Sequence, residues 1–181
     1  MTLLEMIDLA RDWIGEPLGT RTFPDNSSGF WGDTTLQRYH NIAQQEVALE
    51  LQTVFEDYLV THTTINITAN CAAYVLPANF IRMRFVEDVR QSNPITILPT
   101  TMGMRDFDDV VFVSGTFEGG QYYLRGTEMV FTDTPTFNAA SGVRIYYVKE
   151  IPDVTASTDS SELPTEHHRI VAYGIAKFAM Y

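Results

Sequence analysis

The chain has 181 residues, 45% of them hydrophobic and 12% aromatic, which is typical of a globular domain with a real core and excludes a disordered chain. Its net charge of −11 argues against ordinary nucleic-acid binding, because such binding needs a positive footprint. Residues 1–60 contain ten acids and only three bases, so the acidic excess is concentrated in the opening of the chain. A solubilising surface would explain this imbalance, and so would a surface that must lie near DNA without adhering to it.

The cysteine count and the charge pattern of the chain exclude several classes of protein. The single cysteine, Cys71, excludes an internal disulfide and a cysteine-rich zinc site. Acidic residues stand where a signal peptide would have its basic region, and the longest uncharged run, 58–81, is interrupted by polar residues and Pro77. We therefore expect synthesis in the cytoplasm and no membrane span.

Two helices are predicted in the first sixty residues. Thr2 can cap the first helix, and Glu5 completes a capping box. Residues 15–32 are rich in Gly, Pro, Ser and Thr and indicate a loop. Asp33 is suited to cap a second, amphipathic helix that runs to about Tyr58 and would be about 37 Å long.

The stretch 74–86 is the centre of the predicted β-region. Pro77 cannot donate to a sheet ladder, so one strand ends before it and a second begins at Ile81. Alternation in this second strand predicts one buried and one exposed side. The residues expected on the buried side are Ile81, Met83 and Phe85, and those on the exposed side are Arg82 and Arg84. Further strands are predicted at 63–68, 94–99, 121–124, 128–131 and 142–148, with Gly126 in the turn of a hairpin.

The end of the chain predicts a linker and a last helix. Residues 152–164 are rich in Ser, Thr, Asp and Pro, and Thr165 can cap the helix that follows. Short connections between successive strands imply antiparallel pairing. We therefore predict an α+β fold, a helical bundle of the N-terminal helices plus the C-terminal helix with an inserted antiparallel β-region. Its parts are residues 1–60, the β insertion 61–151, and the linker and helix 152–181.

No enzyme class emerges from the sequence, which has no phosphate loop, dinucleotide fingerprint, His-Glu-x-x-His pair or nucleophile elbow. Adjacent His167 and His168 would point about 100° apart on a helix, so exposed histidines of a first turn are favoured over a metal pair. A solvated loop is favoured over a calcium site for Asp106, Asp108 and Asp109, because the glycine and glutamate of an EF-hand are missing. We therefore predict no catalytic residue, no cofactor and no metal.

Two surfaces are candidates for protein contacts. Arg82 and Arg84 could bind a carboxylate surface of a neighbouring copy, or could form an ordinary solvated strand face. The last helix is apolar over more than one face, which fits a docking element as well as a third core helix. Its docking candidates are Ile170, Val171, Tyr173, Ile175, Phe178 and Tyr181.

Several short motifs, taken in order, are similar to a known family. They are Trp31-Gly-Asp33-x-x-Leu36, Asn41 on the long helix, Tyr74-x-Leu76-Pro77-x-x-Phe80-x-Arg82, Tyr123-Leu124-x-Gly126, and Leu163-Pro164 with His167. The ordered set resembles the head-to-tail connector proteins (adaptor or head completion proteins) of tailed bacteriophages, over most of the chain.

The resemblance implies a structural virion protein at the head–tail interface rather than an enzyme. Such connectors form a ring, usually of twelve copies, beneath the portal, extend the DNA channel and provide a platform for the tail. The implied partners are other copies of the chain, the portal protein against which the last helix would lie, and a tail or nozzle protein. DNA would pass through the channel without specific binding, and no membrane is involved. The acids expected to line this channel are Glu46, Glu50, Glu56 and Asp57.

Two alternatives to the connector remain open. One is another virion component, such as a tail completion or terminator protein. The other is a cellular binding module or an enzyme whose site the sequence does not reveal.

Overall fold

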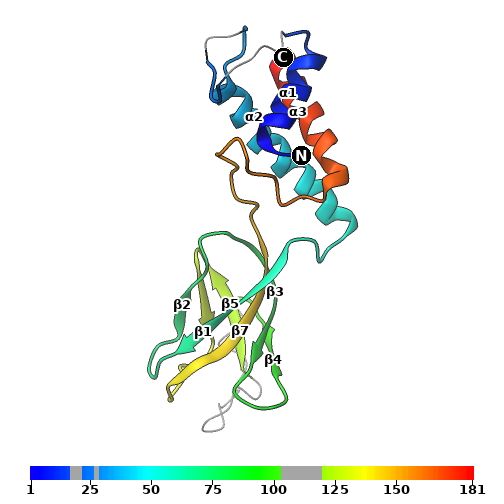
Figure 1. Ribbon diagram of the computed structural model, residues 1–181. Coiled ribbons are helices and arrows are strands. Elements are labelled where there is room, and N and C mark those ends of the chain that lie inside the picture. The colour runs from blue at the N-terminus through cyan, green and yellow to red at the C-terminus, as the bar shows by residue number, and fades with distance from the viewer. Residues whose placement is uncertain (17–21, 27–28, 103–119) are drawn as a thin grey trace. The chain divides into compact units, whose positions relative to one another are not determined.

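The computed structural model describes residues 1–16, 22–26, 29–102 and 120–181. The chain divides into two compact units (Figure 1). The helical unit comprises Met1–Tyr58 and Glu150–Tyr181, and the sheet unit comprises Leu59–Lys149. The predicted loop acids Asp106, Asp108 and Asp109 lie outside the described residues.

Among its described residues, the helical unit contains three α-helices and one short 3₁₀ turn. Their bounds are α1 (Leu3–Trp13), α2 (Asp33–Val54), η1 (Thr165–His167) and α3 (His168–Met180). The sheet unit contains the strands β1 (Val60–Ile67), β2 (Ala73–Val75), β3 (Phe80–Asp88), β4 (Ile95–Pro99), β5 (Gln121–Arg125), β6 (Glu128–Phe131) and β7 (Ala139–Lys149).

The predicted fold class, a helical bundle with an inserted antiparallel β-region, is wrong. In the part of the chain that the structure describes, the dominant feature is one seven-stranded sheet in the order β1-β7-β3-β4-β5-β6-β2, accompanied by three helices. The sheet is also mixed, because β4 and β5 pair in parallel. Strands that follow one another were expected to pair antiparallel. This holds for β3 with β4 and for β5 with β6, but β1 pairs with β7 and β2 with β6. Alternation in a sequence shows which side chains face inward, but it does not identify the neighbouring strand.

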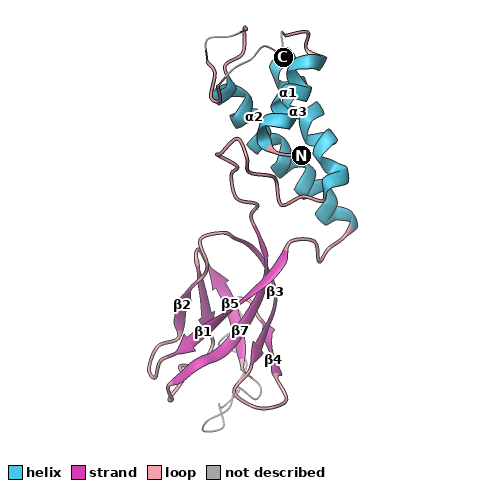
Figure 2. Ribbon diagram, viewed as in Figure 1, coloured by secondary structure: helices cyan, strands magenta, loops and turns pink. Residues whose placement is uncertain are grey.

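The sheet is strongly curled (Figure 2). Its two edge strands, β1 and β2, follow one another in the chain, from Ile67 to Ala73. In a flat sheet of seven strands, edges would lie about 29 Å apart at about 4.8 Å per strand. This connection can span at most about 22 Å, so the sheet must bend its edges toward each other.

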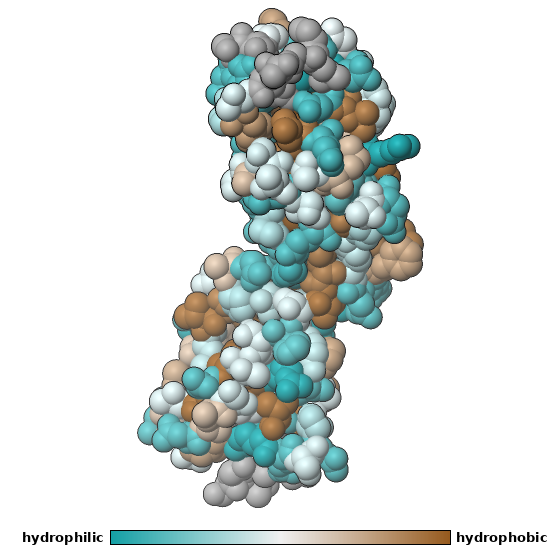
Figure 3. Space-filling model, in the orientation of Figure 1, coloured by the Kyte–Doolittle hydropathy of each residue, from teal (hydrophilic) through white to brown (hydrophobic). Residues whose placement is uncertain are grey.

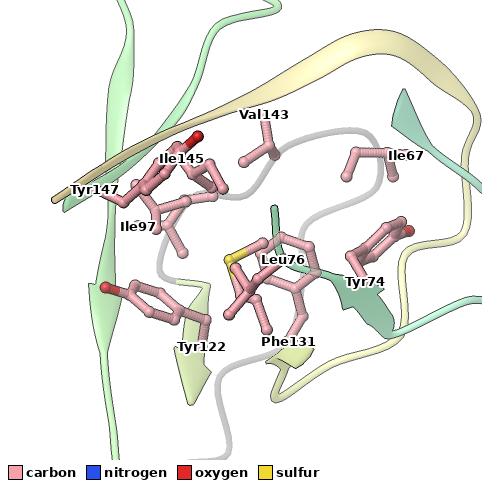
Figure 4. Close-up of a cluster of buried hydrophobic side chains, with 11 residues drawn as sticks. Ile67, Tyr74, Leu76, Ile97, Tyr122, Phe131, Val143, Ile145 and Tyr147 are labelled. Carbon is pink, nitrogen blue, oxygen red and sulfur yellow. The ribbon is translucent and has the colours of Figure 1, made fainter. Parts of the chain in front are cut away.

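The interior of the curled sheet is a hydrophobic core (Figure 4). The rings of Tyr74 and Phe131 meet edge to face, with centroids 5.6 Å apart. The Tyr74 hydroxyl donates to the Cys71 carbonyl at 2.8 Å and accepts from the Thr68 amide at 3.1 Å, which closes the β1–β2 turn. The buried members of the core are Ile67, Tyr74, Leu76, Val86, Ile97, Tyr122, Met129, Phe131, Val143, Ile145 and Tyr147.

The predicted alternation in β3 is wrong. Ile81 is 46% exposed and Phe85 40% exposed, and only Met83 packs against the core. Two irregularities in the pairing with β7, between Phe80 and Arg82 and between Met83 and Phe85, explain the difference. Each irregularity shifts the side chains that follow to the other face of the sheet.

Two predicted local structures are confirmed. Thr2 and Glu5 form the expected capping box at the start of α1. Strands β5 and β6 form the expected hairpin, and Gly126 in its turn has a φ of +59°, a conformation that favours glycine.

The ends of the other two helices differ from the prediction. Gly32, not Asp33, is the N-cap of α2, and the helix ends at Val54, before Tyr58. Thr165 does not cap α3, because it lies inside the 3₁₀ turn that precedes that helix.

Helices α2 and α3 approach closely and run antiparallel. A Cβ atom added to Gly174 would lie 2.7 Å from the Cβ of Ala43, so the two backbones are nearly in contact there. Four residues along each helix, the rings of Tyr39 and Phe178 have centroids 5.9 Å apart. Residue numbers decrease along α2 in the direction in which they increase along α3, so the two helices run antiparallel.

Candidate interaction surfaces

A buried ion cluster holds the loop between α1 and α2. Arg11 is almost fully buried and donates to Glu16, to the Trp31 carbonyl and, at 3.0 Å, to Asp33. Glu16 in turn accepts from the amides of Phe30 and Trp31 at 2.7 and 2.8 Å. Asp33 therefore anchors the loop through Arg11 rather than capping the helix.

The segment 152–164, which was predicted to be a linker, contains no helix or strand, and side chains of α2 bind its backbone. The Asn41 side chain accepts from the Val154 amide at 3.0 Å and donates to the Val154 carbonyl at 3.4 Å. Gln37 donates to the same carbonyl at 3.0 Å, and Gln44 donates to the Pro152 carbonyl at 3.0 Å. Polar side chains of α2 thus replace the missing secondary structure as partners for this backbone.

Asn41 was singled out only by its place in the family resemblance. Its two bonds to Val154 give it a structural role, the fixing of the return segment against α2. The sequence of α2 indicates this role, because the amide side chains of Gln37, Asn41 and Gln44 recur at the spacing of one helix face. A helix face of amides is suited to bind backbone groups.

The two adjacent histidines have different environments. His168 is buried, its Nε2 donating to the Leu163 carbonyl at 2.8 Å and its Nδ1 lying 2.8 Å from the amino group of Met1. His168 is therefore not the exposed first-turn residue that was predicted, whereas His167 is partly exposed. A third histidine, His40, is also buried, and burial lowers its pKa from the ordinary value of 6.5.

The six predicted docking residues of the last helix fall into two groups. Val171 and Ile175 are fully buried in the helical unit and belong to its core, and Phe178 packs against Tyr39. The exposed members are Ile170, Tyr173 and Tyr181. The docking surface predicted from the sequence is therefore about half core.

The exposed face of α3 extends onto α1. Ile170 and Tyr173 are 51% and 62% exposed, and Met180 lies on the same side of the helix. The Tyr173 ring meets the exposed Trp13 ring edge to face, with centroids 6.3 Å apart. Figure 3 shows apolar side chains reaching the surface of the helical unit among polar ones.

The four predicted channel acids also separate. Glu46 and Glu50 are exposed on α2, where Ile42 and Leu49 on the same side are 45% and 56% exposed. The other two acids, Glu56 and Asp57, are exposed in the turn after α2. The exposure of Ile42 and Leu49 was not predicted from the sequence, because both fall inside a helix that was expected to bury its apolar residues.

Arg82 and Arg84 line one hollow of the sheet unit. Its volume is about 410 Å³, and the other lining residues come from β3, the end of β4 and β5. Tyr122 and Tyr123 of β5 also belong to this lining. The predicted pair is thus brought together, in a concave setting that the strand pattern did not indicate.

Within the ranges that the structure describes, no helix combines the length and apolar character needed to cross a membrane. The same ranges hold no group of three or more His, Cys, Asp or Glu side chains placed to bind one metal ion.

A family model matches this chain. The family described as "SU10 adaptor protein" matches residues 1–181, which is the whole sequence shown. No curated protein matches the chain. The family match confirms the resemblance to phage adaptor proteins that the ordered motifs predicted.

Proposed function

This chain belongs to the SU10 adaptor protein family, and on that premise we propose that it is a structural component of a phage virion at the junction of head and tail. In this proposal it forms a ring, of twelve copies as in the connectors it resembles, beneath the portal. The ring extends the DNA channel and gives the tail its platform. The observation that carries the proposal is the family match over both units of the chain.

The charge of the chain is compatible with a DNA channel. A net charge of −11 repels phosphate, so DNA can slide past without adhering. Of the four acids predicted for the channel wall, we assign Glu56 and Asp57 to it. Glu46 and Glu50 share their helix face with exposed Ile42, which suits a protein contact better than a wall facing DNA.

Three surfaces would meet neighbouring proteins of the particle. We assign the portal contact to the end of α3, where Tyr181 is exposed. The hollow lined by Arg82 and Arg84 would bind a carboxylate of a neighbouring copy, because guanidinium groups pair well with carboxylates. A loop of the sheet unit would contact the tail protein.

The role we propose is structural, not catalytic. Two groups that could have been chemical have structural partners: the Cys71 thiol donates to the Ala73 carbonyl at 3.2 Å, and the His168 ring bonds to Leu163.

Purified protein mixed with the portal protein of the same phage tests this proposal. We expect a ring-shaped complex by electron microscopy, with a mass equal to one portal plus a fixed number of copies of this chain. In virions, an image reconstruction should place the chain at the head–tail vertex. A location elsewhere in the particle, or no association with portal at any ratio, would refute the proposed function.

A further inference from the structure

The helical unit has two exposed stripes, and each lies opposite the buried side of its own helix. The α2 stripe consists of Ile42, Glu46, Leu49, Glu50 and Thr53, and the α3 stripe consists of Arg169, Ile170, Tyr173, Lys177 and Met180. Within each stripe the residues recur at three- and four-residue steps, so they share one face of the helix. Each stripe is part apolar and part charged.

The two stripes carry opposite charge. From Ile42 to Val54, α2 has two acids and no base, whereas α3 has two bases and no acid. Among the described residues of the helical unit, Arg38 is the only exposed cation outside α3, because Arg11 is buried. The α3 stripe is therefore an isolated basic surface in an otherwise acidic unit.

Neither stripe finds its charge partner among the residues that the structure describes. In the parts of the chain that the structure describes, no ion pair involves the side chains of Glu46, Glu50, Arg169 or Lys177. The exposed apolar residues beside them are also uncovered. A surface that combines large apolar side chains with unpaired charge of one sign suits a partner of the opposite sign.

The positions along the two helices also match. Ala43 lies beside Gly174 and the helices are antiparallel, so Arg169 lies level with Ala48. At about 1.5 Å per residue, Arg169 is then about 3 Å along the axis from Glu46 and about 3 Å from Glu50. By the same count Ile170 lies level with Val47, two residues from Leu49.

A closed ring relates its copies by rotation without a rise, so equivalent levels stay aligned when the helices run along the ring axis. Arg169 of one copy would then face Glu46 and Glu50 of the next, while Ile170 and Tyr173 would cover Leu49 and Ile42. Lys177 lies level with His40, beyond both acids, and is not needed for this contact.

We propose that the α2 stripe of one copy binds the α3 stripe of the next copy. The inference rests on the ring proposed above, and it supplies what a ring of identical subunits requires, namely two different and complementary faces on each subunit. A self-complementary patch on one face would instead give a closed dimer.

Charge reversal with a mixing step tests the proposal. The E46K/E50K variant has two basic stripes, and the R169E variant has an α3 stripe without its key cation. When portal is present at 0.15 M salt, the self-association of each variant alone should be weaker than that of the unmodified chain by more than about tenfold. The reason is that like charges would meet in every contact. An equimolar mixture should recover ring formation, since each contact then joins opposite charges.

The matched control for E46K/E50K is D12K/D153K, which makes the same change in net charge at exposed acids outside both stripes. Circular dichroism and thermal unfolding check that every variant is folded. Rings formed by the folded single-stripe variants, or no recovery in the mixture, would overturn the inference while leaving the adaptor role intact. Failure of the unmodified protein to form any ring with portal would instead overturn both.

Discussion

Replacing Gly174 with alanine tests how closely α2 and α3 pack. Two effects oppose each other. Alanine favours a helix over glycine by about 1 kcal/mol. The new methyl group, however, would lie 2.7 Å from the Cβ of Ala43, where carbon atoms in contact are normally about 3.5–4.0 Å apart.

The crowding should be the larger effect. The clashing atom of Ala43 is attached directly to the backbone, so it cannot rotate away and the helices must separate by about 1 Å. Overpacking of this kind costs about 1–3 kcal/mol. We therefore expect G174A to lower the free energy of unfolding of the helical unit by about 1 kcal/mol, although helix propensity alone predicts the opposite sign.

A second substitution separates the two effects. In A43G/G174A the nearest remaining atom to the new methyl group is the Cα of residue 43, at 3.7 Å, which is ordinary contact. A43G alone should cost about 1 kcal/mol through helix propensity. The free energy of unfolding of the double variant should then exceed the value expected from adding the two single effects by about 1–3 kcal/mol. This difference is the coupling energy of the contacting pair.

Tryptophan fluorescence during urea unfolding is a suitable assay. Both tryptophans of the chain, Trp13 and Trp31, lie in the helical unit, so the signal reports that unit even when the sheet unit unfolds separately. A stabilising G174A, or additive effects in the double variant, would show that the helices are farther apart than the structure has them.

Three other changes address the interior of the helical unit. Asn41→Leu should cost about 1–3 kcal/mol, because it leaves the Val154 amide without its partner; limited proteolysis should then cleave the return segment sooner, and unchanged protection would contradict its anchoring by α2. Arg11→Met should destabilise by about 3–5 kcal/mol because Asp33 loses its buried cation, and a loss below 1 kcal/mol in urea unfolding would mean that the cluster is not closed. Burial lowers the pKa of His40, so the imidazole binds a proton more readily in the unfolded chain than in the folded one. The contribution of neutral His40 to stability is therefore fully present above about pH 6.5. It falls as the pH decreases toward the lowered pKa, by at most about 1.4 kcal/mol per pH unit. His40→Gln should show a smaller loss between pH 7.5 and 5.5 than the unmodified chain, and an equal loss would assign the pH dependence to another group.

Features determined by a few neighbouring residues were predictable from the sequence. The capping box of Thr2 and Glu5 and the turn at Gly126 need only local geometry, and both are present. The family could also be predicted, because its motifs are short and ordered.

Features that depend on distant parts of the chain were not predictable in the same way. The pairing of β2 with β6 rather than with β3 leaves no mark in the alternation of either strand. Arg11 reads as an ordinary polar residue outside the apolar stripe, because the carboxylates that make its burial possible lie 5 and 22 residues away. The irregularities in β3 exposed Ile81 and Phe85 for the same reason, since a local pattern cannot show where a ladder slips.

The surface of α2 divides into three faces around its circumference. One face, with Leu36 and Ala43, packs in the helical core, and a second, with Gln37 and Asn41, holds the return segment. The third face is the acidic and apolar stripe around Glu46, which has no cover within the described chain. Because successive residues turn by about 100°, a substitution on α2 should act according to its angle rather than its place in the sequence. Changes on the first two faces should alter unfolding, whereas changes on the third should leave unfolding unaltered and affect only assembly.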